Sequence, residues 1–489
     1  MTRITFPRTL PDLTRPDTLV VLAPEAAYAG GWHRRVLTRA LAQRVEAMVK
    51  GVSGGACGTR VEAVTPDRPK RIVAGVLPSS YSRHNAPSQV EAVWSVMRGM
   101  KLAGRVHVIA RVDEAEQIQG TLGGIARCFP LYDRKTGGKS GPPSLAFHAC
   151  DGKGKVVAVP PRAKLVVDMG REAARLVDMP TEELTTAQFV KEARKLIRAI
   201  PNVKTRVIVG EDLAKQGLGG IYGVGKAAVV APRLLIMDYR PPKAKRTVAL
   251  VGKGVVYDTG GLHIKGRGSM ESMKADMGGA AAVTGAFRVL AEGRAKCRVI
   301  AFCPLAENSV DAHSYRPDDI LTMHSGHTVE INNTDAEGRL LLGDGVSYAA
   351  RKYKPDVIIN AATLTGAQLI ATGKAHAGVV SNREGLETLA VDVGRSVGEM
   401  CFPMPFCPEL YQAEFASQVA DMKNSVKNRM NAQASCAAQF VYSHIDDLDV
   451  PWLHVDLAGP AWRHDRGTGF GVGLLTGIAD AVRDAHLGA

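Results

Sequence analysis

The chain has 489 residues, of which 45% are hydrophobic and 22% are charged, with 51 glycines. This composition excludes fibrous and disordered proteins and is typical of a folded α/β protein with more than one domain. Apolar runs are too short to span a membrane and the first residues lack a signal-peptide core, so we expect a cytoplasmic protein without membrane contact. The net charge of +14 leaves nucleic-acid binding open, but the dispersed basic residues favour a solvated surface.

The eight cysteines are scattered along the chain and form no C-x-x-C pair. A disulfide framework or a zinc finger would show paired or regularly spaced cysteines. The pattern therefore predicts buried, reduced thiols.

In chain order, residues 1–165 alternate short β-branched runs with segments of helical apolar spacing. The expected strands cover 18–23, 71–78, 105–112, 144–150 and 155–160, and the expected helices fall within 33–49 and 87–103. The glycine-rich segment 133–143 is predicted to be a mobile surface loop. We predict a smaller N-terminal α/β domain, and we find no catalytic constellation in it.

Residues 166–180 are expected to form a connecting helix that Pro180 ends. The larger C-terminal domain, 181–489, is predicted to begin with a helix at 185–199. Its expected strands cover 205–210, 233–239, 247–252, 297–306 and 356–364. These runs are almost entirely apolar, as strands covered by helices on both faces are. We therefore predict a central mixed sheet flanked by helices.

Charged residues follow the strand at 247–252 directly: Lys253, Asp258, Lys265 and Asp276. Two glycine pairs, at 260–261 and 278–279, are expected to turn the backbone sharply around them. In an open α/β sheet, ligands bind at the carboxyl ends of the strands. The sequence therefore predicts a site at this edge of the sheet.

A second charged group, Asp335, Glu337 and Arg339, precedes an expected helix that ends near residue 353. Spacing by two places side chains on one face of an extended segment, so we expect these residues to converge. Together with Asp258 and Asp276 they would bring four carboxylates into one crevice. Such a group requires cations for neutralisation.

Oxygen ligands without cysteine or a histidine pair suit Zn²⁺, Mn²⁺, Co²⁺ or Mg²⁺. Four carboxylates exceed the needs of one ion, so shared ligands predict two metals. One lysine would then be a neutral nitrogen ligand and the other a charged electrophile. The alternative, a set of salt-bridged surface residues, would suit any single member better than the whole group.

Three other patterns are weaker. The segment 220–227 resembles a phosphate-binding loop but lacks the hydroxyl residue after Lys226, and 467–473 lacks the spacing of a dinucleotide fingerprint. His324 and His327 form H-x-x-H without the glutamate that zinc peptidases need. We expect no ligand at any of them.

The charged motifs resemble those of the leucine (cytosol) aminopeptidase family, which are dinuclear-metal exopeptidases. The matching stretches are "VGKGVVYDTGGLHIK" (251–265), "MKADMGGAAAV" (273–283), "NTDAEGRL" (333–340), "NAATLTGA" (360–367) and "HVDLAGPAW" (454–462). The stretch 407–426 is similar to the "aminopeptidase-like 1" branch of that family.

The resemblance implies a role for each metal ligand. Asp258 and Glu337 would bridge the two ions. Lys253 and Asp276 would complete the tighter site, and Asp335 the exchangeable one. These roles are carried over only because the motifs match residue by residue.

It also implies that Lys265 polarises the scissile carbonyl and that Arg339 holds a bicarbonate acting as general base. Ala461 stands where many relatives carry a bulkier methionine, which predicts a more open pocket. The implied substrate-binding residues are Met273, Asn333, Thr363, Leu364, Gly366 and Ala461.

The activity implied is removal of the N-terminal residue from peptides by a hydroxide that both metals activate. The free α-amino group would bind one metal and Asp276. The resemblance further implies a homohexamer whose active sites face an interior cavity. An additional nucleic-acid-binding role is the alternative that the positive charge leaves open.

Overall fold

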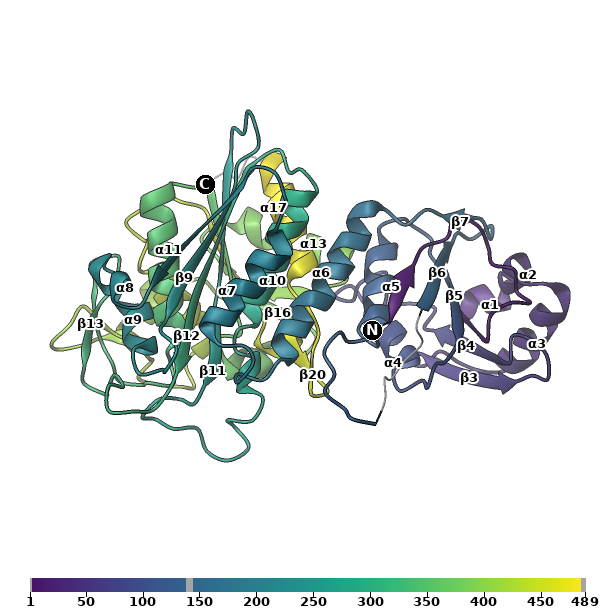
Figure 1. The fold of residues 1–489 in the computed structure, drawn as a ribbon, viewed down its shortest axis with the longest axis horizontal. Helices are drawn as coiled ribbons and strands as arrows, with labels where there is room; N and C mark the ends of the chain where they lie inside the picture. Colours follow the sequence, from purple (N-terminus) through teal and green to yellow (C-terminus); the bar gives the residue numbers. More distant parts are fainter. Residues whose placement is uncertain (1, 138–143, 485–489) are drawn as a thin grey trace. The chain divides into compact units, whose positions relative to one another are not determined.

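The computed structural model describes residues 2–137 and 144–484, which form two compact α/β units (Figure 1). Unit 1 comprises residues 1–171 with 394–400, and unit 2 comprises 172–393 with 401–489. The division falls inside helix α6 (Pro161–Asp178). Of the predicted loop at 133–143, residues 133–137 are mostly exposed and 138–143 lie outside the described residues.

Unit 1 is built on a mostly parallel sheet with the strand order β1-β6-β5-β2-β4-β3. Among the described strands of this unit, the edge strand β3 and the short β7 are the ones that pair in the antiparallel sense. The central strands are buried along almost their whole length, as the apolar runs predict. The strands are β1 (Arg3–Thr5), β2 (Thr18–Pro24), β3 (Thr59–Val64), β4 (Arg71–Leu77), β5 (Arg105–Arg111), β6 (Ser144–Cys150) and β7 (Val156–Val157).

Two hydrophobic clusters of buried residues in unit 1 bury alternate side chains of the same strands. Val20 belongs to one cluster and Val21 to the other, because successive strand residues point to opposite faces of a sheet. The helices are α1 (Glu25–Ala29), α2 (His33–Val36), α3 (Arg39–Val49), α4 (Val90–Met97) and α5 (Gln117–Ala126).

Unit 2 contains a larger mixed sheet with the order β17-β16-β19-β15-β10-β12-β9-β8, and β11 pairs with β12 beside this path. Four neighbouring strands, β19, β15, β10 and β12, run parallel at its centre. The strands are β8 (Val203–Val209), β9 (Arg233–Tyr239), β10 (Thr247–Gly252), β11 (Gly254–Asp258), β12 (Arg298–Asn308), β15 (Val357–Ala362), β16 (Ala377–Ser381), β17 (Cys401–Pro403) and β19 (Trp452–Asp456).

Helices cover both faces of this central sheet (Figure 1). Helix α10 (Gly278–Glu292) packs on β10, β12 and β15 together with α17 (Val472–Asp484), and α11 (Gly338–Tyr353) packs on the same strands with α9 (Gly219–Gly225) and α15 (Gln433–Tyr442). The remaining helices of this unit are α7 (Thr186–Ile197), α8 (Glu211–Lys215), α12 (Gly366–Ala371), α13 (Glu384–Val397), α14 (Pro408–Tyr411) and α16 (Ala458–Ala461). The predicted fold class, two α/β domains with a mixed sheet in the larger, is confirmed.

Short elements complete the second unit. Strands β13 (Ile320–Thr322), β14 (Thr328–Glu330) and β18 (Met422–Lys423) form a small sheet, and β20 (Trp462–Arg463) pairs with β21 (Arg466–Gly467). Two 3₁₀ turns lie at η1 (Met273–Ala275) and η2 (Gln412–Phe415). Among the described residues, no helix is both long and apolar enough to cross a bilayer.

Two local expectations are wrong. Strand β8 was expected to be covered on both faces, but it is a sheet edge where Ile208 is the one buried position. The second glycine pair does not reverse the chain, because it begins helix α10. Its Gly279 instead permits close packing, since an added Cβ would lie 2.2 Å from the carbonyl oxygen of Ala361.

The prediction of buried thiols is met by five of the eight cysteines, whereas Cys128 and Cys407 are partly buried and Cys57 is exposed. No disulfide links any of them within the described residues.

Candidate metal centre

The charged motifs meet at the carboxyl edge of the four parallel strands of unit 2. Lys253 follows β10 and Thr363 follows β15, while Asn308 ends β12 and Asp456 ends β19. Parallel pairing in register brings these ends together, with Gly252 beside Ala361 and Ala362 beside Asp456. The fold therefore brings the charged residues together at the edge of the sheet where the sequence predicted a site.

The first of two charge clusters surrounds Lys253, which is 2% exposed. Its ammonium Nζ lies 2.8 Å from each carboxylate oxygen of Asp276 and 3.0 Å from Oε1 of Glu337. It also donates a hydrogen bond of 3.0 Å to the carbonyl of Thr363. Gly338 makes this approach possible, because a Cβ there would lie 2.5 Å from Nζ.

The second cluster surrounds Lys265. Its Nζ lies 2.8 Å from Oδ2 of Asp258 and 2.5 Å from Oδ1 of Asp335. The turn between Asp258 and Lys265 contains Gly260 and Gly261, both with positive φ, so the first glycine pair reverses the chain as predicted. The Lys265 side chain is 15% exposed, whereas that of Lys253 is 3% exposed, so the second cluster is the one nearer solvent.

The two clusters are in contact. Carboxylate oxygens of Asp258, Asp335 and Glu337 lie within 4.8 Å of one another, close enough to share an ion. Oε2 of Glu337 is buried and accepts no hydrogen bond from the described residues. A buried carboxylate oxygen without a donor requires a cation, so these residues fit a metal site.

The pKa values report the crowding of like charges. Burial, reinforced by the Glu337 carboxylate, raises the pKa of Asp258 to about 6. Burial also raises the pKa of Asp276 well above its usual range, with the Glu337 and Asp258 charges adding to the effect. The pKa of Glu337 is lowered despite its burial, because the ammonium groups of Lys253 and Lys265 favour its charged form.

The lysines show the opposite balance. Burial favours the neutral amine at Lys253, but the carboxylates of Asp276 and Glu337 outweigh it, and the pKa is raised. The pKa of Lys265 is raised for the same reason, with Asp258 as its main partner. Both lysines therefore act as counter-charges, and a divalent cation beside Lys253 would take over that role.

Arg339 lies in the first turn of α11 and is 4% exposed. Burial lowers the pKa of its guanidinium to about 10. Its Nη1 donates to the carbonyl of Asn424 at 2.9 Å, and its Nε is buried without an acceptor among the described residues. The free N–H leaves a position where a small anion could bind.

The expected extended geometry of residues 335–339 is wrong. Thr334 and Asp335 form a turn, and Glu337 is the N-cap of α11 with helical dihedral angles. Convergence of the carboxylates results from this turn and from the packing of α11 on the sheet, rather than from alternation along a strand. The residues spaced by two do converge, but a turn and the packing of α11 bring them together, not an extended segment.

The predicted pocket residues fall into two groups. Thr363 donates from Oγ1 to Oδ1 of Asp276 at 2.8 Å, and Leu364 and Gly366 follow in the same loop. Ala461 is 3% exposed, and a Cβ on Gly278 would lie 3.4 Å from its Cβ and 3.2 Å from Thr363 Cγ2. The side chains of Thr363 and Ala461 therefore lie close together beside Asp276.

The second group precedes the carboxylates. Met273 begins the 3₁₀ turn that leads to Asp276, and it is partly exposed. The Asn333 side chain accepts a 2.9 Å hydrogen bond from the backbone of Asp335. That contact fixes the loop, so the amide oxygen of Asn333 is already engaged within the protein.

Sequence reasoning missed the residues that hold the carboxylates in place. Asn308 donates to Asp258 at 2.8 Å and to the carbonyl of Thr334 at 3.0 Å. Asn424 bonds both backbone groups of Asn333, and Asp456 accepts from the backbone of Leu364 at 3.1 Å. Their position at strand ends was the available signal for Asn308 and Asp456, and no local signal distinguished Asn424.

Two of the three weaker patterns lie outside the carboxylate group, whereas Thr468, within 467–473, bonds the backbone carbonyl of Ala461. Residues 219–225 form helix α9 rather than a phosphate-binding loop. His324 bonds Ser347 through Nδ1 at 3.0 Å, and neither it nor His327 belongs to the carboxylate group. The class of protein defined by this fold and site is a two-domain α/β metallohydrolase.

Comparisons with known proteins identify the family. The model of the cytosol aminopeptidase family, catalytic domain, matches residues 171–476. Human "Probable aminopeptidase NPEPL1" is 44% identical over 409 residues, which cover 82% of this chain and 78% of the relative. "Leucine aminopeptidase 1" of Caenorhabditis elegans is 39% identical over 408 residues, or 82% of each chain.

Solved structures agree over nearly the whole chain. C. elegans leucine aminopeptidase superposes with a TM-score of 0.88 at 32% identity, covering 99% of this chain and 100% of that one. Leucyl aminopeptidase from Trypanosoma brucei, in complex with actinonin, superposes with a TM-score of 0.88 at 35% sequence identity, covering 98% of this chain and 95% of that one. The bottromycin maturation enzyme BotP, in complex with Mn, superposes with a TM-score of 0.78 at 26% sequence identity, covering 96% of this chain and 100% of that one.

The chain belongs to the cytosol aminopeptidase family. It is a metal-dependent aminopeptidase, as the sequence motifs predicted. The alternative nucleic-acid-binding role receives no support from these relatives.

Proposed function

We propose that unit 2 holds two divalent ions between its two lysine-centred clusters and removes N-terminal residues from peptides. Asp258 and Glu337 would be shared by the two sites, Lys253 and Asp276 would complete one of them, and Asp335 would complete the other. The observation that carries this proposal is the contact between the clusters, with three carboxylates within 4.8 Å and an unpartnered oxygen on Glu337. When bound, the ions supply Lewis-acid polarisation of the peptide carbonyl and activation of water.

The two lysines have separate tasks in this proposal. Lys253 would hold an ion through a neutral amine, since the ion would replace the positive charge that the carboxylate neighbours of Lys253 stabilise. Lys265, in the more exposed cluster, stays charged and donates to the carbonyl oxygen of the substrate as negative charge develops there. Their different exposures, 3% and 15%, support this division.

Arg339 is proposed to hold a bicarbonate, which would supply a general base for the hydrolysis. Its buried guanidinium and unpartnered Nε support anion binding. Asp276 is proposed to accept a hydrogen bond from the free α-amino group of the substrate. That contact explains the restriction to chain ends, because an internal residue has no such amine.

The substrate pocket is proposed to include Met273, Thr363 and Ala461, with Asn333, Leu364 and Gly366 shaping its loops. Its apolar members favour N-terminal residues with aliphatic or long unbranched side chains. We further propose Zn²⁺ or Mn²⁺ as the native ions, with Co²⁺ and Mg²⁺ as substitutes. The Mn-bound relative supports manganese, and the name "Probable cytosol aminopeptidase" of relatives supports a cytoplasmic enzyme. The homohexamer is proposed from the resemblance of the motifs alone.

The test is a metal titration with substrates of defined N-terminal residue. Metal-free protein is reconstituted separately with Zn²⁺, Mn²⁺ and Co²⁺, and cleavage of a panel of aminoacyl-coumarin substrates is followed. Two equivalents of metal per chain should restore activity, and N-acetylated substrates should not be cleaved. Full activity with one equivalent, or cleavage of blocked substrates, would contradict the proposed centre.

A further inference from the structure

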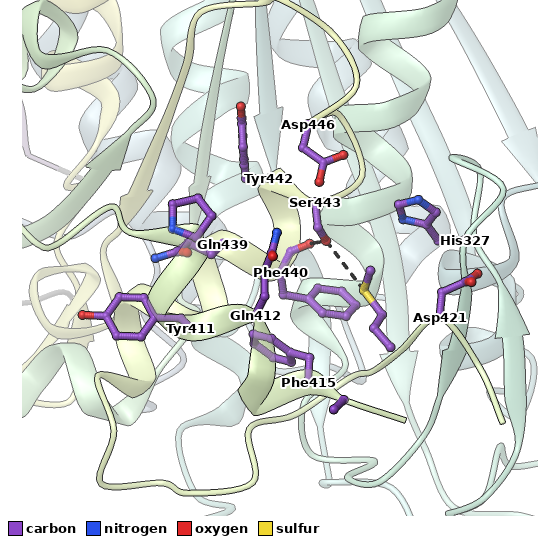
Figure 2. Close-up of a pocket in the computed structure, with 13 residues that line it drawn as sticks. His327, Tyr411, Gln412, Phe415, Asp421, Gln439, Phe440, Tyr442, Ser443 and Asp446 are labelled. Atoms are coloured by element: carbon purple, nitrogen blue, oxygen red, sulfur yellow. Dashed lines mark hydrogen bonds between the residues drawn. The ribbon is translucent and has the colours of Figure 1, made fainter. Parts of the chain in front are cut away.

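A cavity of about 330 Å³ lies in unit 2, outside the metal centre (Figure 2). It is formed by α14, η2, β18 and α15, and none of its lining residues belongs to the predicted site. Much of its wall comes from residues 408–422, within the stretch 407–426 that the sequence analysis singled out, and Asn424, which supports the metal centre, does not line it. The cavity therefore needs its own explanation.

Aromatic rings make up much of the cavity wall (Figure 2). Phe415 and Phe440 pack with their ring centroids 5.8 Å apart, and Tyr411 and Tyr442 line the same space. Aromatic faces bind apolar stems, and they also attract cations through the ring quadrupole.

The charge of the cavity is opposite to that of the protein. Its thirteen described lining residues include Asp421, Asp446 and His327 but neither lysine nor arginine. Over the whole chain, 62 basic residues outnumber 48 acidic ones. An acidic, aromatic cavity on a basic protein selects positively charged ligands.

The carboxyl groups of Asp421 and Asp446 differ in the direction in which their surroundings shift the pKa. Asp421 accepts hydrogen bonds from the backbone and hydroxyl of Thr328, both at 2.8 Å, and these bonds hold its pKa below the usual range. Burial raises the pKa of Asp446, and a nearby cation would stabilise its charged form.

A buried amide provides the second polar feature. Gln439 lines the cavity and is 6% exposed, and neither its Oε1 nor its Nε2 has a hydrogen-bond partner among the described residues. A buried primary amide without partners is costly, and a ligand that reaches it with a peptide group would satisfy both its donor and its acceptor.

We propose that this cavity binds an organic cation, a guanidinium or alkylammonium group on an aliphatic stem, with arginine or lysine side chains of peptides as its best ligands. The carboxylates of Asp421 and Asp446 receive the cation, the aromatic rings cover the stem, and Gln439 pairs with a peptide group. The inference is independent of the metal centre, since it uses none of the residues assigned there.

The test uses the full chain and N-acetyl-arginine amide, whose blocked amine prevents its use as an aminopeptidase substrate. Isothermal titration calorimetry should show saturable one-to-one binding, and N-acetyl-glutamate amide should not bind. Asp446→Asn should weaken binding by about three- to tenfold, the effect of one partly buried charge. Asp447→Asn is the matched control, because it removes the same charge from a neighbouring residue that pairs with Arg351 instead.

The cation could come from a peptide side chain or from a free organic cation. Agmatine distinguishes these two sources, since it has the guanidinium and the stem without peptide groups. We expect it to bind more weakly than N-acetyl-arginine amide, and we expect Gln439→Met to remove that difference. Equal affinities in the unaltered protein would assign the site to free organic cations. Equal binding of the arginine and glutamate probes, or no effect of Asp446→Asn, would overturn the proposal.

Discussion

The two units present the same kind of sheet edge, yet only one collects charge. In unit 1, carboxylates also follow the parallel strands, but those of Glu25 and Asp151 already accept hydrogen bonds from nearby protein groups. Glu25 accepts from Ser53 and Gly54 at 3.0 Å, and Asp151 accepts from two backbone N–H groups of its own turn. In unit 2, the carboxylates face one another across lysines, and Glu337 retains an unpartnered oxygen.

The difference shows what turns a strand end into a site. A carboxylate whose lone pairs are satisfied locally gains little from a cation, whereas a buried one facing another carboxylate needs it. Among the described residues, the group of carboxylates that could hold a metal lies in unit 2. The comparison can be tested by removing matched groups from the two edges.

The largest effect is expected from Glu337→Ala. Loss of a carboxylate shared by both ions should lower turnover by more than about 10³-fold and reduce the metal bound per chain. Glu25→Ala, at the edge of unit 1, is the matched control and should leave both values unchanged. Metal analysis by mass spectrometry and steady-state kinetics measure the outcome. Near-normal activity of Glu337→Ala with two bound ions would refute the assignment of the site.

The two lysines should differ in how they fail. Lys265→Met should keep both ions and a similar KM while kcat falls about 10²–10³-fold, the usual effect of losing one donor to a developing oxyanion. Lys253→Ala should lose the tighter ion, and added metal should restore part of the activity. If Lys265→Met lost an ion while Lys253→Ala kept both, the two roles would be reversed.

Asn308→Ala tests the support of the carboxylates. Removing its donor to Asp258 should weaken metal affinity about 10–100-fold, as loss of a hydrogen bond to a metal ligand does. Excess metal should then recover activity. Ser53→Ala removes a donor to Glu25 at the other edge and should leave metal affinity unaltered. A loss of activity in Asn308→Ala that metal does not rescue would instead indicate a folding defect.

Substrate preference should follow the apolar lining near Ala461. Aminoacyl-coumarins with aliphatic or methionyl residues should be cleaved with at least about tenfold higher kcat/KM than those with Asp or Glu. Ala461→Met should reduce the rate for the longest side chains most, because it narrows the pocket wall. Fastest cleavage of acidic substrates would show that these residues do not form the pocket.

The smallest effect concerns acid stability of the unit 2 core. Burial lowers the pKa of His444 to about 3, so below its unfolded value of about 6.5 only the unfolded chain takes up the proton. Stability should therefore fall as the pH drops from 6.5 toward 3, and His444 should contribute about 2 kcal/mol to the loss at pH 5. Urea unfolding at pH 7 and at pH 5 measures the free energy of unfolding. Its decrease between the two pH values should be smaller for His444→Gln than for the exposed control His313→Gln. Identical decreases in the two variants would show that His444 does not contribute to the loss of stability in acid.

Much of the molecule could be predicted from the sequence because the signals are local. Apolar runs such as 247–252 are typical of buried strands, and a helix is predicted directly after the charged residues 335–339. The charged motifs predict the residues of the proposed centre and, through family resemblance, the aminopeptidase class, which the comparisons confirm. Each of those inferences depends on residues close together in the chain.

The tertiary structure alone decided the contacts between distant segments. Parallel pairing of β10 with β15 brings Lys253 beside Thr363, and pairing of β11 with β12 brings Asp258 beside Asn308, which no local pattern predicts. Asn424 holds the loop of Asn333 from far along the chain, and the backbone at Glu337 is helical because α11 packs on the sheet. Strand order and packing set these distances, and they depend on the whole chain rather than on the spacing within any motif.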